Sequence, residues 1–275
     1  MIKDIVVHLT GSDEDQTRID HAAAIARRFD AHLTGLQTHV LPKLIAITDP
    51  SGSAFLQDMI AESIDRAQVT SERLRASLAA LGLRHELRRL DLYPSETGAA
   101  LAAEARSCDL FVGTRPYSDP SHEEYIEEAV IFGSGRGSLF IPPKLKASES
   151  FESVLVAWKP SREAARAVAE ATPFLLQARH VVVAIVEEKG ASEQWRNEPG
   201  ADIGRHLSRH GISAEIRLID GWSDPTDALL NEAKATGSDL LAMGAYGHPR
   251  FLEWVAGGVT RRILAECPIP VLVAH

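Results

Sequence analysis

Residues 3–12, KDIVVHLTGS, are repeated in diverged form by residues 152–161, ESVLVAWKPS. In each copy a short apolar run of strand type leads into a turn, and an alanine-rich segment with helical spacing follows. A second pair of matching segments lies further along, TGAALAAEARSCDLFVG at 97–113 and TDALLNEAKATGSDLLAMG at 226–244. The chain is therefore predicted to hold two diverged copies of one α/β domain.

Short apolar runs alternate with helical patterns along the chain. In the first copy the expected elements are strands at 5–9, 31–38, 83–91 and 109–113, and helices at about 53–80 and 94–107. Strands that are separated by helices favour a parallel sheet covered on both faces. We predict two consecutive doubly wound α/β domains, 1–147 and 148–275, with the long helix of the second shortened to about 200–210.

Composition and charge exclude several classes of protein. The net charge is −9, so the basic surface that a nucleic acid requires is not expected. The N-terminus has no basic start and no long apolar core, and no apolar stretch approaches the ~20 residues of a membrane span. We expect a cytoplasmic protein without a signal peptide, whose two cysteines are buried thiols.

A glycine motif begins at the end of the second-to-last strand-like run. Gly244, Gly247 and Gly257 stand in a Gly-x-x-Gly-x9-Gly spacing, and Gly258 comes directly before the helical pattern VTRRILAEC. A ligand of a doubly wound sheet lies beyond such strand ends. Glycines let the backbone approach phosphate oxygens, and a helix N-terminus favours an anion. The motif predicts a phosphate-binding loop.

Residues of the first helical turn add to this prediction. Thr260 brings a hydroxyl, and Arg261 and Arg262 bring positive charge. Signatures of enzymes are missing, since neither copy carries a Gly-x-Gly-x-x-Gly after its first strand, a Walker lysine or a Gly-x-Ser-x-Gly elbow. No catalytic residue is expected, and any ATP hydrolysis would be slow.

The glycine motif, the VLVAW start of the second copy and the ending CPIPVLVAH together resemble the universal stress protein family, in its tandem form with two domains in one chain. This resemblance implies a five-stranded parallel sheet in each domain, domains paired through their last strands, and adenine nucleotide at the carboxyl edge of the sheet. The positions that match the ATP-binding members are Gly244, Gly247, Gly257, Val259 and Thr260.

The second copy departs from the family pattern at two places. Gly258 stands where Ser or Thr is usual, and Lys159 stands where the first strand normally ends in Asp, between Trp158 and Pro160. Lys159 is able to reach a phosphate but cannot accept a hydrogen bond as Asp does. The full predicted set for ATP or another adenine nucleotide is Ala157, Trp158, Lys159, Gly244, Gly247, Gly257, Gly258, Val259 and Thr260. The alternative is that the glycines only shape a turn and a helix start in a site that has lost its ligand.

The first copy departs further from the family. Thr10 stands at the Asp position, and no second glycine follows DLFVG at the required spacing. Residues 133–136, Gly-Ser-Gly-Arg, are a candidate anion nest without a following helix. We predict a degenerate domain that serves mainly as the partner of the second. His206 and His210 share a helix face, which is interpreted as solvated rather than as a metal site.

The functional hypothesis is a non-catalytic stress-response protein that binds adenine nucleotide in its second domain. Its expected partners are the nucleotide, a protein that the sequence does not name, and a second copy of the chain in a homodimer, with no nucleic acid and no membrane. Two alternatives stay open, a ligand-free interaction module of the same fold and a slow ATPase.

Overall fold

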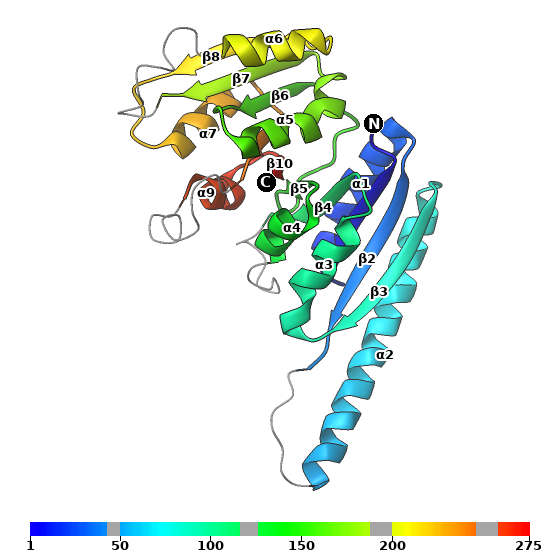
Figure 1. Cartoon of the computed structure of the whole chain (residues 1–275). Helices are drawn as coiled ribbons and strands as arrows, with labels where there is room; N and C mark the ends of the chain where they lie inside the picture. The colour runs from blue at the N-terminus through cyan, green and yellow to red at the C-terminus, as the bar shows by residue number, and fades with distance from the viewer. Residues whose placement is uncertain (43–49, 116–125, 188–199, 246–257) are drawn as a thin grey trace.

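The computed structural model describes residues 1–42, 50–115, 126–187, 200–245 and 258–275, without the side chains of 50–53 (Figure 1). We call β1 to β5 with their helices the N-terminal half, and β6 to β10 with theirs the C-terminal half. The N-terminal half contains β1 (Asp4–Leu9), α1 (Glu14–Phe29), β2 (His32–Val40), α2 (Pro50–Ala80), β3 (His85–Leu92), the 3-10 turn η1 (Pro94–Glu96), α3 (Thr97–Ala105), β4 (Leu110–Thr114), α4 (Ile126–Ser134) and β5 (Gly137–Ile141). The C-terminal half contains β6 (Ser153–Ala157), α5 (Arg162–Leu175), β7 (His180–Val186), α6 (Ala201–Arg209), β8 (Glu215–Ile219), α7 (Pro225–Ala235), β9 (Leu240–Gly244), α9 (Val259–Glu266) and β10 (Val271–Ala274).

The strands form one continuous ten-stranded sheet in the order β3-β2-β1-β4-β5-β10-β9-β6-β7-β8. Neighbouring strands are parallel within each half, as the alternation of strands and helices predicts. The two halves meet where β5 and β10 pair antiparallel, with Leu139 opposite Leu272. The predicted α/β fold and the pairing through the last strands are confirmed.

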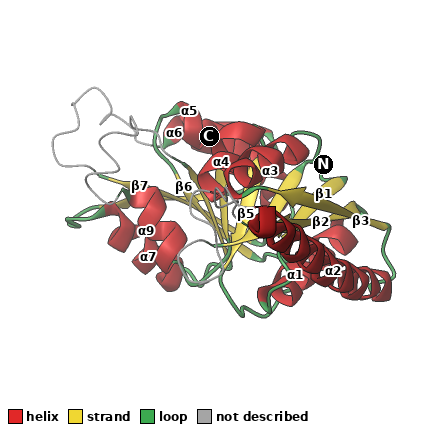
Figure 2. Cartoon of the chain, turned by 90° about the horizontal axis from the view of Figure 1, so that it is seen from below, coloured by secondary structure: helices red, strands yellow, loops and turns green. Residues whose placement is uncertain are grey.

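Helices cover both faces of the sheet (Figure 2). Because side chains of a strand alternate between faces, the buried strands supply two apolar layers. Val154 and Val156 pack on one face with α5 and α6, while Leu155 packs on the other with α7 and α9. The N-terminal half repeats this arrangement with α1 and α2 on the first face and α3 and α4 on the second.

Aromatic side chains hold the two halves together away from the sheet. Phe29 of α1 meets Phe174 of α5 edge to face at 5.6 Å between ring centroids, and Phe151 of the linking segment meets the same ring at 5.5 Å. Such pairs add about 0.5–1.5 kcal/mol each beyond the apolar area that they bury. The boundary at 147/148 stays a prediction, since β5 ends at Ile141 and β6 begins at Ser153.

Two helices differ from the sequence predictions. The long α2 begins at Pro50 rather than at about 53, and its first turns project beyond the sheet (Figure 1). Helix α4 was not predicted, because only one short apolar stripe marks it. Ile126, Val130 and Ile131 form that stripe and are buried, and the helix packs on α3. The predicted short helix at 200–210 is confirmed as α6.

Candidate functional site

The carboxyl edge of the C-terminal half brings together the described members of the predicted site. Ala157 ends β6 beside Met243, and Gly244 ends β9 beside Ala274. The chain continues beyond β6 through Trp158, whose N–H donates to the Ala184 carbonyl at 2.9 Å. Gly247 and Gly257 lie outside the described residues.

Helix α9 leads from this edge into β10. Gly258 is its N-cap residue, Val259 its first residue, and Thr260 is buried in the first turn. Among the described residues, none caps the helix with its side chain, and the first turn contains no acidic residue. Because a helix that connects parallel strands starts at the carboxyl edge, its positive end lies where a ligand of this fold binds.

Gly244 has a contact that the motif does not predict. A Cβ at this position would stand 2.5 Å from the Ala164 nitrogen and 2.6 Å from the Glu163 carbonyl carbon. Glycine is therefore required here because the first turn of α5 lies directly against the end of β9. The sequence predicts that Gly244 lets the backbone approach a phosphate. In the structure, the missing side chain makes room for the backbone of α5.

The N-terminus of α5 is closed by its own residues. Ser161 is the N-cap, and its hydroxyl accepts from Ala164 N–H at 3.2 Å. Burial acts to raise the pKa of Glu163, but hydrogen bonds from its own N–H, Ser161 and Arg162 outweigh it and hold the pKa below the usual range. Lys159 is exposed in the turn before this cap, and Trp158 packs against the core on the α5 and α6 face.

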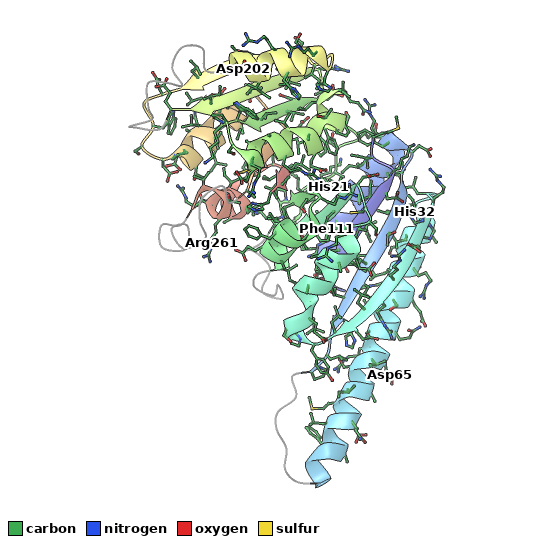
Figure 3. The ribbon with its side chains drawn as sticks, in the orientation of Figure 1. His21, His32, Asp65, Phe111, Asp202 and Arg261 are labelled. Atoms are coloured by element: carbon green, nitrogen blue, oxygen red, sulfur yellow. The ribbon has the colours of Figure 1, made fainter. Side chains whose placement is uncertain are left out.

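The Arg262 side chain is held by carboxylates of α7 and α9. Its guanidinium pairs with Asp224 at 2.6 Å, Asp227 at 3.0 Å and Glu266 at 3.1 Å. Hydrogen bonds to these carboxylates raise the pKa of the Arg262 side chain, although burial opposes them. The expectation that Arg262 supplies charge to a phosphate is therefore wrong, because this side chain ties α9 to α7. Arg261 is exposed on α9 (Figure 3).

The carboxyl edge of the N-terminal half is built differently. The buried carboxylate of Asp15 accepts from Thr10 N–H at 2.9 Å and Gly11 N–H at 2.7 Å, closing the turn after β1. Arg18, also buried, pairs with Asp15 at 3.2 Å and donates to the Thr114 hydroxyl at the end of β4. Burial raises the pKa of Asp15 above its ordinary value, although Arg18 and the two N–H groups oppose the shift.

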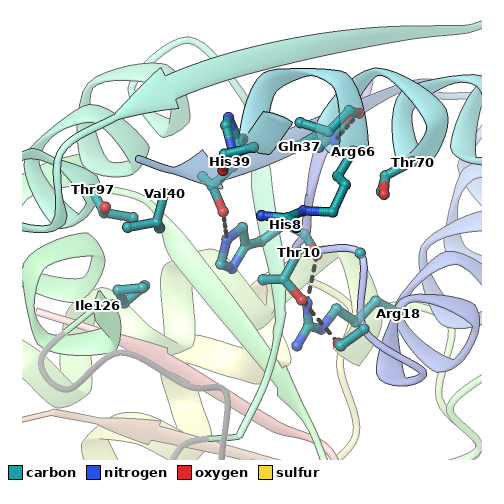
Figure 4. A pocket seen from close by; sticks show the side chains of 15 residues that line it. His8, Thr10, Arg18, Gln37, His39, Val40, Arg66, Thr70, Thr97 and Ile126 are labelled. Carbon is teal, nitrogen blue, oxygen red and sulfur yellow. Dashed lines mark hydrogen bonds between the residues drawn. The ribbon is translucent and has the colours of Figure 1, made fainter. Parts of the chain in front are cut away.

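A cavity of about 480 Å³ opens beside this network (Figure 4). It lies between the ends of β1 and β2, with α2, α3 and α4 contributing to its wall. His8, Gln37 and Thr38 line it and are almost completely buried. Sequence reasoning missed this site, although one signal was available, because polar residues interrupt the buried runs IVVHL and LTGLQT.

The predicted anion nest at 133–136 falls at the end of α4, not at a helix start. Arg136 N–H donates to the Ser134 hydroxyl at 3.1 Å, and its side chain donates to the Arg106 carbonyl at 3.2 Å. Gly135 has φ +67°, and its carbonyl accepts from Arg166 at 2.6 Å. These groups bond to one another, and the negative end of the α4 dipole lies among them.

The remaining candidates concern histidine, cysteine and membrane. The rings of His206 and His210 lie 4.7 Å apart on α6, and the described part of the chain holds no group of three or more metal-ligating side chains. Cys108 and Cys267 are buried thiols, as predicted. Among the described helices, none combines the length and apolar character needed to cross a bilayer.

Comparisons with known proteins show which family the C-terminal half resembles. Residues 150–275 match the profile of the universal stress protein family. A universal stress protein of Synechocystis is 35% identical over 66 residues, which are 24% of this chain and 22% of that protein. One of Mycolicibacterium smegmatis is 35% identical over 71 residues, 26% of this chain and 54% of that protein. The chain thus aligns with about half or less of the length of these curated relatives.

The fold comparison extends to the whole chain. The crystal structure of a universal stress protein from Archaeoglobus fulgidus superposes with a TM-score of 0.74 at 16% identity, covering 98% of this chain and 95% of that one. Identity at this level supports the fold alone. The predicted resemblance is confirmed, because residues 150–275 match the universal stress protein family.

Proposed function

We propose that the C-terminal half binds an adenine nucleotide, ATP or AMP, at the carboxyl edge of β6 and β9, and that the chain is a non-catalytic, cytoplasmic regulator of the stress response. The observation that carries this proposal is the start of α9, which no described side chain caps. Gly258 has no side chain, and it places the N–H groups of the first turn of α9 at this edge. The first turn contains no carboxylate. Helix N–H groups and the helix dipole together favour a phosphate there.

The two halves differ at this helix start. Glu127 and Glu128 occupy the first turn of α4, the helix of the N-terminal half that corresponds to α9. Their negative charge stabilises the helix dipole and disfavours a bound phosphate at the same place. The proposal therefore assigns about one nucleotide to each chain, in the C-terminal half.

The proposal assigns no catalytic role to Glu163, the buried carboxylate beside Gly244. A general base must be able to take a proton, and the hydrogen bonds around Glu163 lower its pKa. Its carboxylate caps α5 instead of activating water. We propose that bound nucleotide changes the affinity of the chain for a partner protein, and that turnover is slow.

A second candidate function is a ligand-free interaction module of the same fold. Three observations favour it, namely the packing of Gly244 on α5, the pairing of Arg262 with three carboxylates, and the contact of Trp158 with the core. In this alternative the glycine motif is retained only for turns and helix packing.

Calorimetric titration with ATP, ADP and AMP distinguishes the two. Gly258→Asp places a carboxylate at the N-cap of α9, which suits the helix but repels phosphate. Gly258→Ser is the matched control, because it caps the same helix without charge. The nucleotide proposal expects binding to wild type and to Gly258→Ser and loss in Gly258→Asp. If none of the three nucleotides gives binding heat, the ligand-free interaction module is favoured.

A further inference from the structure

Helix α2 is longer than the strands that it covers, and its first turns extend beyond the sheet (Figure 1). Its 31 residues span about 46 Å, whereas the nine residues of β2 span about 30 Å. Large apolar side chains of this helix are exposed, namely Phe55 at 62%, Met59 at 37% and Val69 at 67%. Exposed apolar residues that gather on one surface mark a place where another molecule binds.

These apolar residues belong to one stripe of exposed positions along α2. The stripe lies apart from the face where Leu74 and Leu78 enter the core. Its members follow one another at alternating intervals of four and three residues, which is the spacing of the contact between two paired helices. We call this set the outer stripe, and it consists of Phe55, Met59, Glu62, Arg66, Val69 and Arg73.

The outer stripe is symmetric about position 64. Met59 and Val69 lie five residues before and after this position. Glu62 and Arg66 lie two residues before and after it. When a two-fold axis at position 64 relates two antiparallel α2 helices, Met59 faces the partner's Val69. Glu62 then faces the partner's Arg66. Each apolar side chain thereby meets an apolar one and each charge meets its opposite, twice by symmetry.

The ends of the outer stripe follow the same symmetry. Phe55 and Arg73 lie nine residues before and after position 64, so Phe55 faces the partner's Arg73. The Arg73 side chain is ordered, because its guanidinium donates to the Gly11 carbonyl at 2.8 Å. An arginine that is held in place presents its apolar stem and its guanidinium to the face of an aromatic ring, which is a favourable contact.

The charge of α2 is divided along its length. Residues 50–65 contain Asp58, Glu62 and Asp65 and no basic residue, a net charge of −3. Residues 66–80 contain three arginines and one glutamate, a net charge of +2. Antiparallel pairing sets the acidic part of each helix against the basic part of its partner, whereas parallel pairing would set like charges together. The charge distribution therefore selects the antiparallel arrangement.

We propose that the outer stripe is a docking surface for a second copy of this chain, with the two α2 helices antiparallel about position 64. The paired segments, residues 55–73, are about 27 Å long. A contact of one helix from each chain is smaller than a standard interface, so we expect a weak dimer with a dissociation constant on the order of 10–100 µM. Helix α2 lies away from α9 (Figure 1), so this proposal is independent of the proposed nucleotide site.

Sedimentation equilibrium of the full chain at about 5 to 500 µM tests the proposal. Glu62→Arg and Arg66→Glu each set two pairs of like charges across the axis. Both side chains are exposed, so the changes should cost the monomer little stability, which thermal unfolding checks. Asp202→Arg is the matched control, because it reverses an exposed acid that is paired with an arginine on a helix of the C-terminal half.

Wild type is expected to dimerise over this range, and each charge reversal is expected to raise the dissociation constant by about tenfold or more. An equimolar mixture of the two reversed variants is expected to associate as wild type does, because every charge faces its opposite in the heterodimer. Phe55→Ser, which changes no charge, is expected to weaken the dimer, and Asp202→Arg to leave it unchanged. Asp65 approaches the partner's Asp65 beside the axis, so Asp65→Asn is expected to tighten the dimer.

Three results would overturn the proposal. A chain that stays monomeric up to about 500 µM has no such docking surface. A dimer that both charge reversals leave unchanged uses another surface. A dimer that both reversals abolish and that the mixture does not restore depends on these residues for a reason other than the facing of Glu62 and the partner's Arg66.

Discussion

The two carboxyl edges of this sheet have the same topology and different chemistry. At the N-terminal edge, a buried Arg18–Asp15 pair joins the ends of β1 and β4, and a polar cavity lies beside it. At the C-terminal edge, Gly244 lets the backbone of α5 approach β9, and α9 starts without an acidic residue. The two halves therefore keep the same strand order while the side chains at their carboxyl edges differ.

Arg18→Met is expected to have the largest effect on stability. It leaves the Asp15 carboxylate buried without its cation, which costs about 3–5 kcal/mol of unfolding free energy. Addition of Asp15→Asn removes the charge and keeps an acceptor for the turn, so the double variant should recover much of the loss. Urea unfolding of the three proteins at pH 7 measures both steps.

The same variant has a predicted pH dependence. The pKa of Asp15 is already raised, and loss of Arg18 raises it further. A carboxyl with a raised pKa favours the folded state below its unfolded pKa, and that contribution is lost as pH rises through the folded pKa. The cost of Arg18→Met should therefore be smaller at pH 4 than at pH 7. An equal cost at both values would show that the pair does not act through charge.

Gly244→Ala tests the backbone packing of the C-terminal edge. The new Cβ would meet fixed helix backbone at 2.5 Å, and overpacking of this kind costs about 1–3 kcal/mol. Gly113→Ala is the matched change at the end of β4, where the nearest atom is Phe111 Cε1 at 3.2 Å. Thermal unfolding should show the larger loss for Gly244→Ala, and the reverse order would remove the packing role of Gly244.

Asp224→Ala is expected to have the smallest effect. Asp224 caps α7 by accepting from Thr226 N–H at 2.7 Å and also pairs with Arg262. Loss of the cap costs about 1 kcal/mol. Asp224→Ser restores the cap without the ion pair and should recover most of it, as measured by urea unfolding.

The effect of Asp224→Ala on stability is expected to depend on pH, because the pKa of Asp224 is shifted in the folded state. Burial acts to raise it, but hydrogen bonds from Thr226 and the charge of Arg262 hold it below the usual range. A lowered carboxyl pKa stabilises the folded state above the unfolded pKa, and this contribution is lost as pH falls through the folded pKa. The difference between wild type and Asp224→Ala should shrink at pH 3, and a constant difference would contradict this.

Most of the fold is predictable from the sequence because strand-like runs and helix patterns are local. The repeat of IVVHL as VLVAW establishes two copies, and the pairing of β5 with β10 follows from the family resemblance. Helix α4 escapes prediction because its apolar stripe is short, and its stability comes from packing on α3. Local patterns do not report such contacts.

The candidate site is less predictable, because its contacts join residues distant in sequence. Gly244 meets Ala164, and Arg18 reaches Thr114, across intervals that no motif spans. In the sequence, a glycine that makes room for a helix backbone cannot be distinguished from one that lets the backbone approach a phosphate. The cavity likewise combines β1, β2 and α2, whose polar positions are visible in the sequence but whose convergence is not.

Equilibrium titration of wild type, Gly258→Asp and Ala67→Met with ATP measures how many nucleotides each chain binds, and so distinguishes one nucleotide site from two. Ala67→Met fills part of the cavity of the N-terminal half, which Ala67 lines. We expect about one ATP per wild-type chain, none in Gly258→Asp and an unchanged value in Ala67→Met. Two ATP per chain, or loss of ATP in Ala67→Met, would contradict this expectation, because the N-terminal edge would then bind nucleotide as well.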